Sequence, residues 1–533
     1  MDESIAWGLA GVLWGGLCVA LVRILVGRRG GTSRRALPPA PPPTPWGLAD
    51  GGLFLLLVIL AAGAVLALRR SIGVTQPIGL DIELWSFAAL DLRSGNPSYM
   101  EPGYPALVAL YGVWTGITNL DAAAQVALLA SVVLPGGVFL VGRELGAPRW
   151  AALVAAALAM GQPRVLSLGQ QVSPDSVTAV LLCALGFTVA RWAARPSAGR
   201  LALLLLVVAA TTLVRHHGLV AAGLLSLLFL ATPAPWPGRG GRVLLVVAVV
   251  ILAPLLAGQT PGLPTGVAWA GRLQVVVDDA FSARPSWSRK IDMGTDPLSI
   301  FLHSVGNTPV GWAWVALCLG LMAWARPATR AAVFTTVATT LPTLLIFSQA
   351  RHVLVVLPIT FAAIAAAVPA APKGVGRLGA ALVVVVFGLA QAGWREERES
   401  LMGLNQLAAE LRRVGLAICA RASEGDLAAG DANMFTFCPM PTNSFALGGA
   451  YAPGSVYRTW WAGDTPPGPG WGAVPIGVGA VRLWRYRYDP DAAEPCAASR
   501  TPRGLPYLSA LSGGTPPGAV ELDPPCGGGG ATP

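Results

Sequence analysis

The residues best suited to chemistry in this sequence are carboxylates that interrupt apolar segments. Asp81 and Glu83 lie two positions apart, and Asp175 begins another apolar segment. Residues two apart share one face of an extended segment but point to different sides of a helix, so that only one acid of a helical pair reaches a given substrate. A carboxylate in such a position can act as a general base, or it can simply solvate a helix end. The residues alone leave both interpretations open.

Cationic and imidazole side chains interrupt apolar sequence at two further points. Where the flanking segments cross a membrane, buried charges are costly and usually have an anionic partner. A lipid phosphate would suit them, because guanidinium pairs bidentately with phosphate oxygens. The alternative is that they only end helices in the headgroup zone. The two groups are Arg215, His216 and His217, and Arg351 with His352.

The composition predicts a membrane protein. Hydrophobic residues make up 54% of the 533 positions and charged residues only 12%, about half the usual charged share. A spanning helix needs roughly 20 mostly apolar residues, and such runs recur along the chain. A net charge of +10 would point to nucleic acid in a soluble protein, but here the arginines fall in short loops between apolar runs, so we expect no nucleic-acid partner.

The apolar windows predict an α-helical polytopic membrane protein with about 12 transmembrane helices, the lipid bilayer being its surroundings. The extracytoplasmic C-terminal part is expected to be a small mixed α/β domain. The expected helices lie near 5–26, 51–68, 122–142, 150–166, 175–194, 200–214, 217–232, 243–257, 308–325, 331–347, 353–370 and 376–393.

Alternate connections between these helices carry the basic residues, including Arg143 with Arg149 and Arg326 with Arg330. The positive-inside rule makes that side cytoplasmic. The segments 69–121 and 258–307 and the C-terminal tail are then extracytoplasmic, with the protein integral to the plasma (inner) membrane.

Three domains follow. Residues 1–50 are expected to form an extra N-terminal transmembrane helix, read as a retained anchor, and a Pro-rich cytoplasmic linker. Residues 51–394 are expected to form the transmembrane core. Residues 395–533 are expected to form the extracytoplasmic domain with a disordered tail.

The C-terminal domain carries both helical and strand patterns. Apolar residues from Leu401 to Val414 recur at helical spacing, and Arg482 to Tyr488 alternates aromatic and basic residues like a strand. That alternation is read as a solvated edge strand, the alternative being a surface for a glycan or acidic lipid.

The segment from Gly79 to Pro105 resembles the first external loop of bacterial membrane glycosyltransferases of the GT-C class. It is most similar to the family 39 branch, which includes protein O-mannosyltransferases and aminoarabinose transferases. In that branch an Asp-Glu or Asp-Asp pair begins the first periplasmic loop, and a Ser-Gly turn followed by proline leads into a juxtamembrane helix. Here Ile82 separates the two acids.

The resemblance implies transfer of a sugar from a polyprenyl-phosphate donor to a lipid, glycan or protein acceptor, with inversion. Asp81 would be the general base and Glu83 would orient the acceptor or bind a metal. Glu101 and Tyr104, in the same external segment, are candidate substrate-binding residues.

Relatives in this class often carry an acid at the external mouth of a helix, where this sequence has Asp175. The alternative is an ordinary helix start, with Ser173 as N-cap and Pro174 at the first helical position. In the resembling family, an Arg-Tyr pair followed by Leu and Pro marks a helix late in the chain. At the equivalent place this chain has Arg351-His352, followed by Pro358.

Two questions stay open at this stage. Asp81, Glu83 and Asp175 could form an oxygen-rich site for Mg²⁺ or Mn²⁺, but the chemistry requires no metal and no cofactor is assigned. A transporter or flippase, or a noncatalytic scaffold, are the alternative functions. The clustering of ionisable residues at helix ends on one face favours catalysis over transport.

Overall fold

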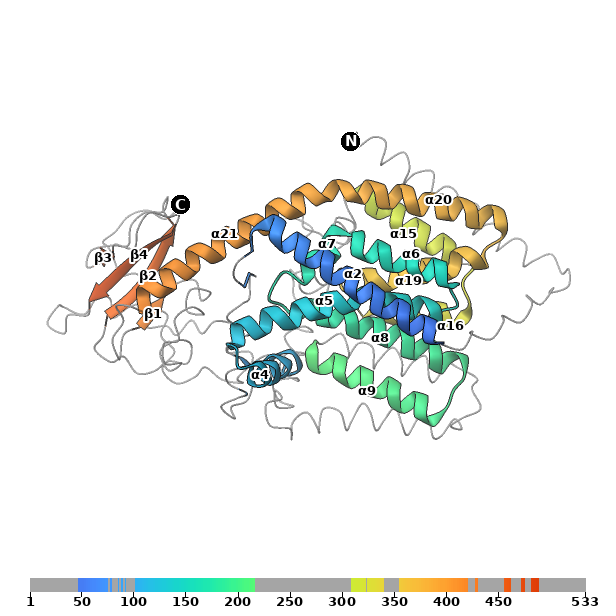
Figure 1. The fold of residues 1–533 in the computed structure, drawn as a ribbon, viewed down its shortest axis with the longest axis horizontal. Coiled ribbons are helices and arrows are strands. Elements are labelled where there is room, and N and C mark those ends of the chain that lie inside the picture. The colour runs from blue at the N-terminus through green and yellow to red at the C-terminus, as the bar shows by residue number, and fades with distance from the viewer. Residues whose placement is uncertain are drawn as a thin grey trace, which may run out of the picture. The chain divides into compact units, whose positions relative to one another are not determined.

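The computed structural model of this chain is mostly helical (Figure 1). The helices expected at 5–26, 217–232 and 243–257 and the loop 258–307 lie outside the residues that it describes. The described residues are 47–74, 77–78, 85, 88–89, 92, 101–215, 308–322, 324–339, 354–419, 427–429, 455–461, 471–474 and 481–487.

These residues form two compact units. The first, called the helical unit below, contains the described residues of 47–73, 124–215 and 308–401. The second unit contains those of 74–123 and 402–487. Each unit is treated by itself.

The helices, in chain order, are α2 (Leu48–Ile72), α4 (Gly103–Thr115), α5 (Asn119–Glu144), α6 (Arg149–Gly161), α7 (Pro163–Leu168), α8 (Asp175–Ala194), α9 (Ala198–Val214), α15 (Thr308–Met322), α16 (Pro327–Ala338), α19 (Leu357–Ala370), α20 (Lys373–Ala390), the 3₁₀ turn η1 (Gln391–Gly393) and α21 (Trp394–Cys419). Within the described residues, the helices expected from the apolar windows are present to within a few residues, with two exceptions. The helix expected over 150–166 is broken, and α16 ends at Ala338, nine residues before the end expected for the 331–347 helix, whose residues 340–347 lie outside the described part. The helical pattern from Leu401 to Val414 is confirmed as part of α21.

The prediction of one continuous helix over 150–166 is wrong. The chain breaks at Gln162, whose backbone is extended (φ −80°, ψ 115°), and a separate short helix, α7, starts at Pro163. Proline lacks the N–H that a helix interior needs, and its ring pushes the preceding residue out of the helical region.

Four helices in the described part of the chain are long and apolar enough to cross a membrane: Leu48–Ile72, Asn119–Glu144, Asp175–Ala194 and the continuous stretch Lys373–Val414. Helix α2 leaves large apolar side chains such as Leu55, Ile59 and Leu60 more than half exposed, as expected of a face that meets lipid acyl chains. The protein is therefore an integral membrane protein.

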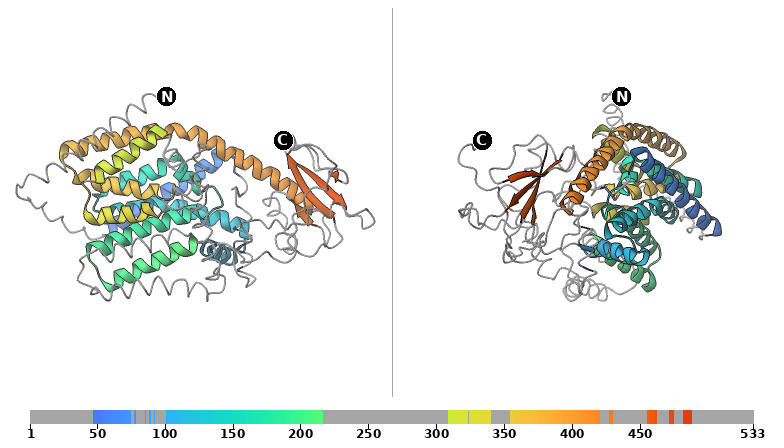
Figure 2. Two further views of the ribbon diagram at one scale, coloured as in Figure 1. Left: turned by 180° about the vertical axis from the view of Figure 1, so that it is seen from behind. Right: turned by 60° about the vertical axis from the view of Figure 1, so that its left-hand side comes forward.

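The core of the helical unit is built on close approaches between small residues. Helix α8 packs against α9 and α16, and α6 packs against α19, with α8 and α9 lying side by side (Figure 2). A Cβ atom added to Gly186 of α8 would lie 2.1 Å from Ile359 Cδ1 of α19, so a larger residue at this crossing would force the Ile359 side chain to move. Small residues at helix crossings allow backbones to approach where lipid offers no hydrophobic driving force.

The second unit contains a four-stranded sheet in the order β1-β2-β4-β3. Its strands are β1 (Leu427–Ala429), β2 (Ser455–Trp461), β3 (Trp471–Val474) and β4 (Val481–Arg487). The strand expected from the Arg482–Tyr488 alternation is present as β4, but its interpretation as an edge strand is wrong. Strand β4 pairs antiparallel with both β2 and β3, so its backbone groups are used on both sides.

Candidate functional site

A buried ion pair joins the start of α8 to the end of α9. Arg215 Nη2 donates to Asp175 Oδ1 at 2.8 Å, and the two side chains are only 9% and 2% exposed. The sequence indicated both residues as candidates, and the fold brings them into contact. A charge pair at this degree of burial is costly to desolvate, so its presence among apolar helices calls for an explanation.

Local structure places both partners. Helices α8 and α9 form a hairpin joined by the short link 195–197, and Ser197 caps α9 by accepting the Arg200 N–H at 3.4 Å. The first residue of α8 therefore lies beside the residue that follows α9. The backbone of Arg215 leaves the helix in an extended conformation (φ −157°) while its N–H still bonds to Thr211 O. The carboxylate of Asp175 also gains from the positive end of the α8 dipole.

The start of α8 differs by one residue from the prediction. Pro174, rather than Ser173, is the N-cap residue, and Asp175 is the first helical residue. Ser173 Oγ still accepts the Asp175 N–H at 3.3 Å, two residues on. The serine thus serves the helix end and the acid binds Arg215, while a role of Asp175 toward substrate stays a prediction.

The turn between α7 and α8 and the first turn of α8 contain further buried polar side chains. Gln170 is 2% exposed, Ser173 3%, and Ser176 and Thr178 are fully buried. Thr178 Oγ1 donates to Pro174 O at 2.9 Å, because a threonine in a helix commonly bonds to the carbonyl four residues earlier. Among the described residues, no hydrogen-bond partner exists for Ser176 Oγ or for either polar atom of the Gln170 side chain.

This turn lies tightly against α5. A Cβ atom on Gly169 would lie 2.1 Å from Ser131 Cβ, and Ser131 is itself buried. Contact at this distance needs glycine, so the position of the turn is set by packing. Sequence reasoning missed Gln170 and Ser176, although a polar run between two apolar helices was the signal that could have found them.

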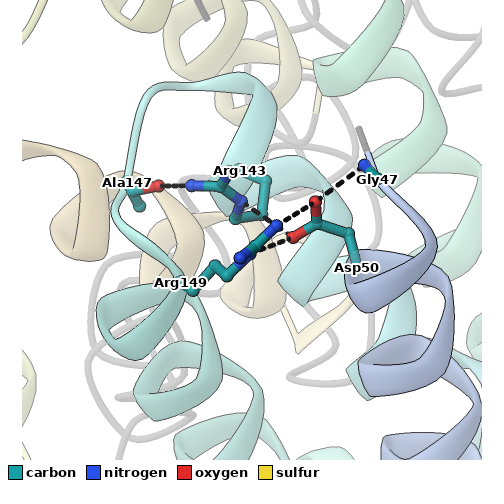
Figure 3. A network of polar contacts seen from close by, with 5 residues as sticks. All are labelled: Gly47, Asp50, Arg143, Ala147 and Arg149. Carbon is teal, nitrogen blue, oxygen red and sulfur yellow. Dashed lines mark hydrogen bonds and ion pairs between the residues drawn. The ribbon is translucent and has the colours of Figure 1, made fainter. Parts of the chain in front are cut away.

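The other end of the helical unit holds a different ion cluster (Figure 3). Arg149 binds Asp50 with two hydrogen bonds, of 3.0 and 3.2 Å, and Arg143 Nε lies 3.3 Å from the same carboxylate. Gly47 N–H also donates to Asp50, capping α2. Asp50, which was not among the residues predicted for a site, is 1% exposed and pairs with both arginines of the 143–149 connection, which was expected to be basic.

Two further contacts bring other connections that were predicted to be basic to the same end of the helical unit as Asp50. Arg191, near the end of α8, lies 3.6 Å from Glu144, and Thr329 Oγ1 donates to Leu145 O at 3.2 Å. Asp175 begins α8, about 30 Å of helix from its other end. The Asp175–Arg215 pair and the basic connections therefore lie at opposite ends of the helical unit.

The other predicted site residues divide into two groups. Glu101 and Tyr104 belong to the second unit; both are buried, and Tyr104 donates its hydroxyl to Ala123 O at 2.8 Å while its ring meets Trp85 edge-on. Their role as substrate contacts stays a prediction. The remaining candidates lie outside the described residues: Asp81, Glu83, His216, His217, Arg351 and His352.

Within the described residues, no three acidic, histidine or cysteine side chains are grouped closely enough to hold a metal ion. Asp81 and Glu83, the other members of the possible Mg²⁺ or Mn²⁺ site, lie outside them.

No family model matches this sequence, and no curated protein matches it. The chain is similar to solved membrane transferases. The archaeal oligosaccharyltransferase AglB from Archaeoglobus fulgidus, solved with an inhibitory peptide and dolichol-phosphate, matches at 12% identity over 77% of this chain and 70% of its own, with a TM-score of 0.46. ArnT from Cupriavidus metallidurans bound to undecaprenyl phosphate matches at 13% identity over 83% and 98%, with a TM-score of 0.44.

The arabinofuranosyltransferase AftD from Mycobacteria matches at 13% identity, over 81% of this chain and 40% of its own, with a TM-score of 0.41.

Proposed function

We propose that this chain is an inverting membrane glycosyltransferase that transfers a sugar from a polyprenyl-phosphate donor to an extracytoplasmic acceptor. The observation that carries the proposal is the Asp175–Arg215 ion pair, buried at the end of the helical unit opposite the basic connections. The sequence resemblance of the 79–105 segment to GT-C enzymes supports the same reaction class.

The guanidinium of Arg215 is suited to the phosphate of the donor. Arginine stays charged even when buried and presents donors in a planar fork that matches phosphate oxygens. Asp175 neutralises this charge before the donor binds and holds the guanidinium in one orientation. In this role Asp175 is a positioning residue and Arg215 binds the leaving group.

The proposed sidedness follows from charge. Short basic connections stay on the cytoplasmic side, and the Asp175–Arg215 pair lies at the other end of the same helices. The donor phosphate and the reaction would thus lie at the extracytoplasmic surface of the plasma membrane, in a multi-pass protein whose C-terminal region is also extracytoplasmic.

The reaction itself is one displacement. Asp81 takes a proton from the acceptor nucleophile, which attacks the anomeric carbon. The bond from that carbon to the phosphate oxygen breaks with inversion, and polyprenyl phosphate leaves with its charge stabilised by Arg215. Glu83 orients the acceptor, which is a lipid, glycan or protein.

Transfer of radiolabelled sugar tests the proposal. The purified protein in lipid is given a panel of polyprenyl-phosphate sugars with candidate acceptors, alongside an Arg215→Gln variant shown to be folded. Label that reaches an acceptor only with the native chain supports the proposal. Absence of transfer with every donor, together with facilitated movement of a lipid-linked sugar across the bilayer, would favour a flippase instead.

A further inference from the structure

Gln170 is a buried polar side chain that belongs to neither the ion pair nor a helix cap. It is 2% exposed, and within the described part of the chain neither its Oε1 nor its Nε2 has a hydrogen-bond partner. Buried amides are almost always hydrogen-bonded, because leaving water without a new partner is unfavourable. An apolar residue of the same size would avoid that penalty.

Some other buried or half-buried polar side chains nearby have protein partners, although Ser176 Oγ, like Gln170, has none within the described residues. Ser167 Oγ donates to Arg164 O and Thr211 Oγ1 donates to Val207 O, as helical hydroxyls commonly do. Gln391 provides the direct comparison, because its Oε1 accepts the Trp394 indole N–H at 2.6 Å. Gln391 thus has a protein partner for its oxygen, although its Nε2 has none within the described residues, whereas neither polar atom of Gln170 has one.

The position of Gln170 is set by its neighbours. Gly169 packs against Ser131 so closely that a Cβ atom would overlap it, and Gln170 N–H bonds to Ser167 O at 2.9 Å. The same turn leads directly into Ser173 and Asp175. The carboxamide is therefore held in the segment that carries the Asp175–Arg215 pair, on a turn that packing keeps from swinging into solvent.

We propose that the Gln170 carboxamide binds a hydroxyl group of the sugar. This inference rests on the proposed function. A carboxamide offers one acceptor oxygen and two N–H donors without charge, which matches a hydroxyl that both donates and accepts. Arg215 supplies the charge for the phosphate, and Gln170 supplies the neutral pair of hydrogen-bonding groups for the sugar.

The test compares binding of two lipids to the purified full-length protein in nanodiscs: bare polyprenyl phosphate and polyprenyl phosphates carrying neutral hexoses or pentoses. The substitution is Gln170→Met, which keeps the unbranched shape and removes the hydrogen-bonding groups. Gln391→Met is the matched control. We expect Gln170→Met to weaken binding of the sugar-carrying lipid about tenfold and to leave the bare lipid unchanged. Gln391→Met should leave the ratio of the two affinities unchanged.

A second arm identifies the source of the hydroxyl. With Gln170→Met, a raised KM for the acceptor and unchanged donor affinity would assign Gln170 to an acceptor sugar, and a weakened donor would assign it to the donor sugar. Unchanged affinities and KM for both substrates, in a native chain that transfers sugar, would overturn the inference and leave the proposed function standing; buried water would then be the partner of Gln170. A native chain that binds no polyprenyl lipid would overturn both.

Discussion

Asp175 and Arg215, 40 residues apart in the sequence, are joined by an ion pair of 2.8 Å that links the first residue of α8 to the residue following α9. The pair can serve the fold, the reaction or both. Removing one partner differs physically from removing both, because a single substitution leaves the other group's charge buried. The two roles can therefore be separated by experiment.

Arg215→Gln is expected to lower stability by about 3 kcal/mol or more, since the charge paired with Asp175 is lost, and to reduce transfer at least 100-fold. The double variant Asp175→Asn/Arg215→Gln should recover most of the stability but none of the transfer. Chemical unfolding in detergent and the radiolabel assay measure the two effects. Recovery of transfer in the double variant would show that the pair serves only the fold.

The Asp50 cluster provides a control at the opposite end of the same helices. Asp50→Asn should lower stability by about 3 kcal/mol, because the buried Arg143 loses its paired carboxylate. Arg149→Gln should cost less than about 1 kcal/mol, because Arg149 is half exposed. Both variants should keep native kcat/KM per folded molecule. A specific loss of transfer in either would place this end of the unit in the reaction.

The contact between Gly169 and Ser131 predicts a rescue. Gly169→Ala forces a methyl group against Ser131 and should cost about 1–3 kcal/mol, with a loss of transfer as the turn carrying Gln170 moves. Combining it with Ser131→Gly removes the overlapping Cβ atom and should restore both thermal stability and transfer. Failure of the second substitution to restore either would argue against this packing.

Gln170→Met has a second expected effect, on stability. Because it removes an amide without a protein partner and keeps the volume, the variant should be as stable as the native chain or up to about 1–2 kcal/mol more stable. Gln391→Met, which breaks the hydrogen bond to Trp394, should be less stable than the native chain. The reverse order in unfolding experiments would contradict the description of Gln170 as unpartnered.

Asp81→Asn tests the general base predicted from the sequence. The substitution should lower kcat by about 100-fold or more while preserving the fold and donor affinity. Asp121→Asn is the matched control, since this carboxylate accepts the Thr118 hydroxyl at the exposed start of α5. Equal activity of both variants would remove Asp81 from the mechanism.

The sequence and the structure contributed different kinds of information. The apolar windows located most helices of the helical unit to within a few residues, because lipid imposes length and composition on each spanning helix separately. They did not include α4, which lies in a segment read as an external loop. The break at Gln162 was missed, because hydrophobicity averaged over a window changes little when one residue is proline. The edge interpretation of β4 was wrong because strand order depends on pairings between distant segments.

Sequence alone determined that this is a helical membrane protein and selected Asp175 and Arg215 as residues worth explaining. Only the tertiary structure decided that these two meet, that Gln170 is buried without a partner among the described residues, and that Asp50 pairs with Arg143 and Arg149 at the other end. The physical reason is that residue type and local periodicity act within one helix, whereas burial and pairing depend on which helices pack together.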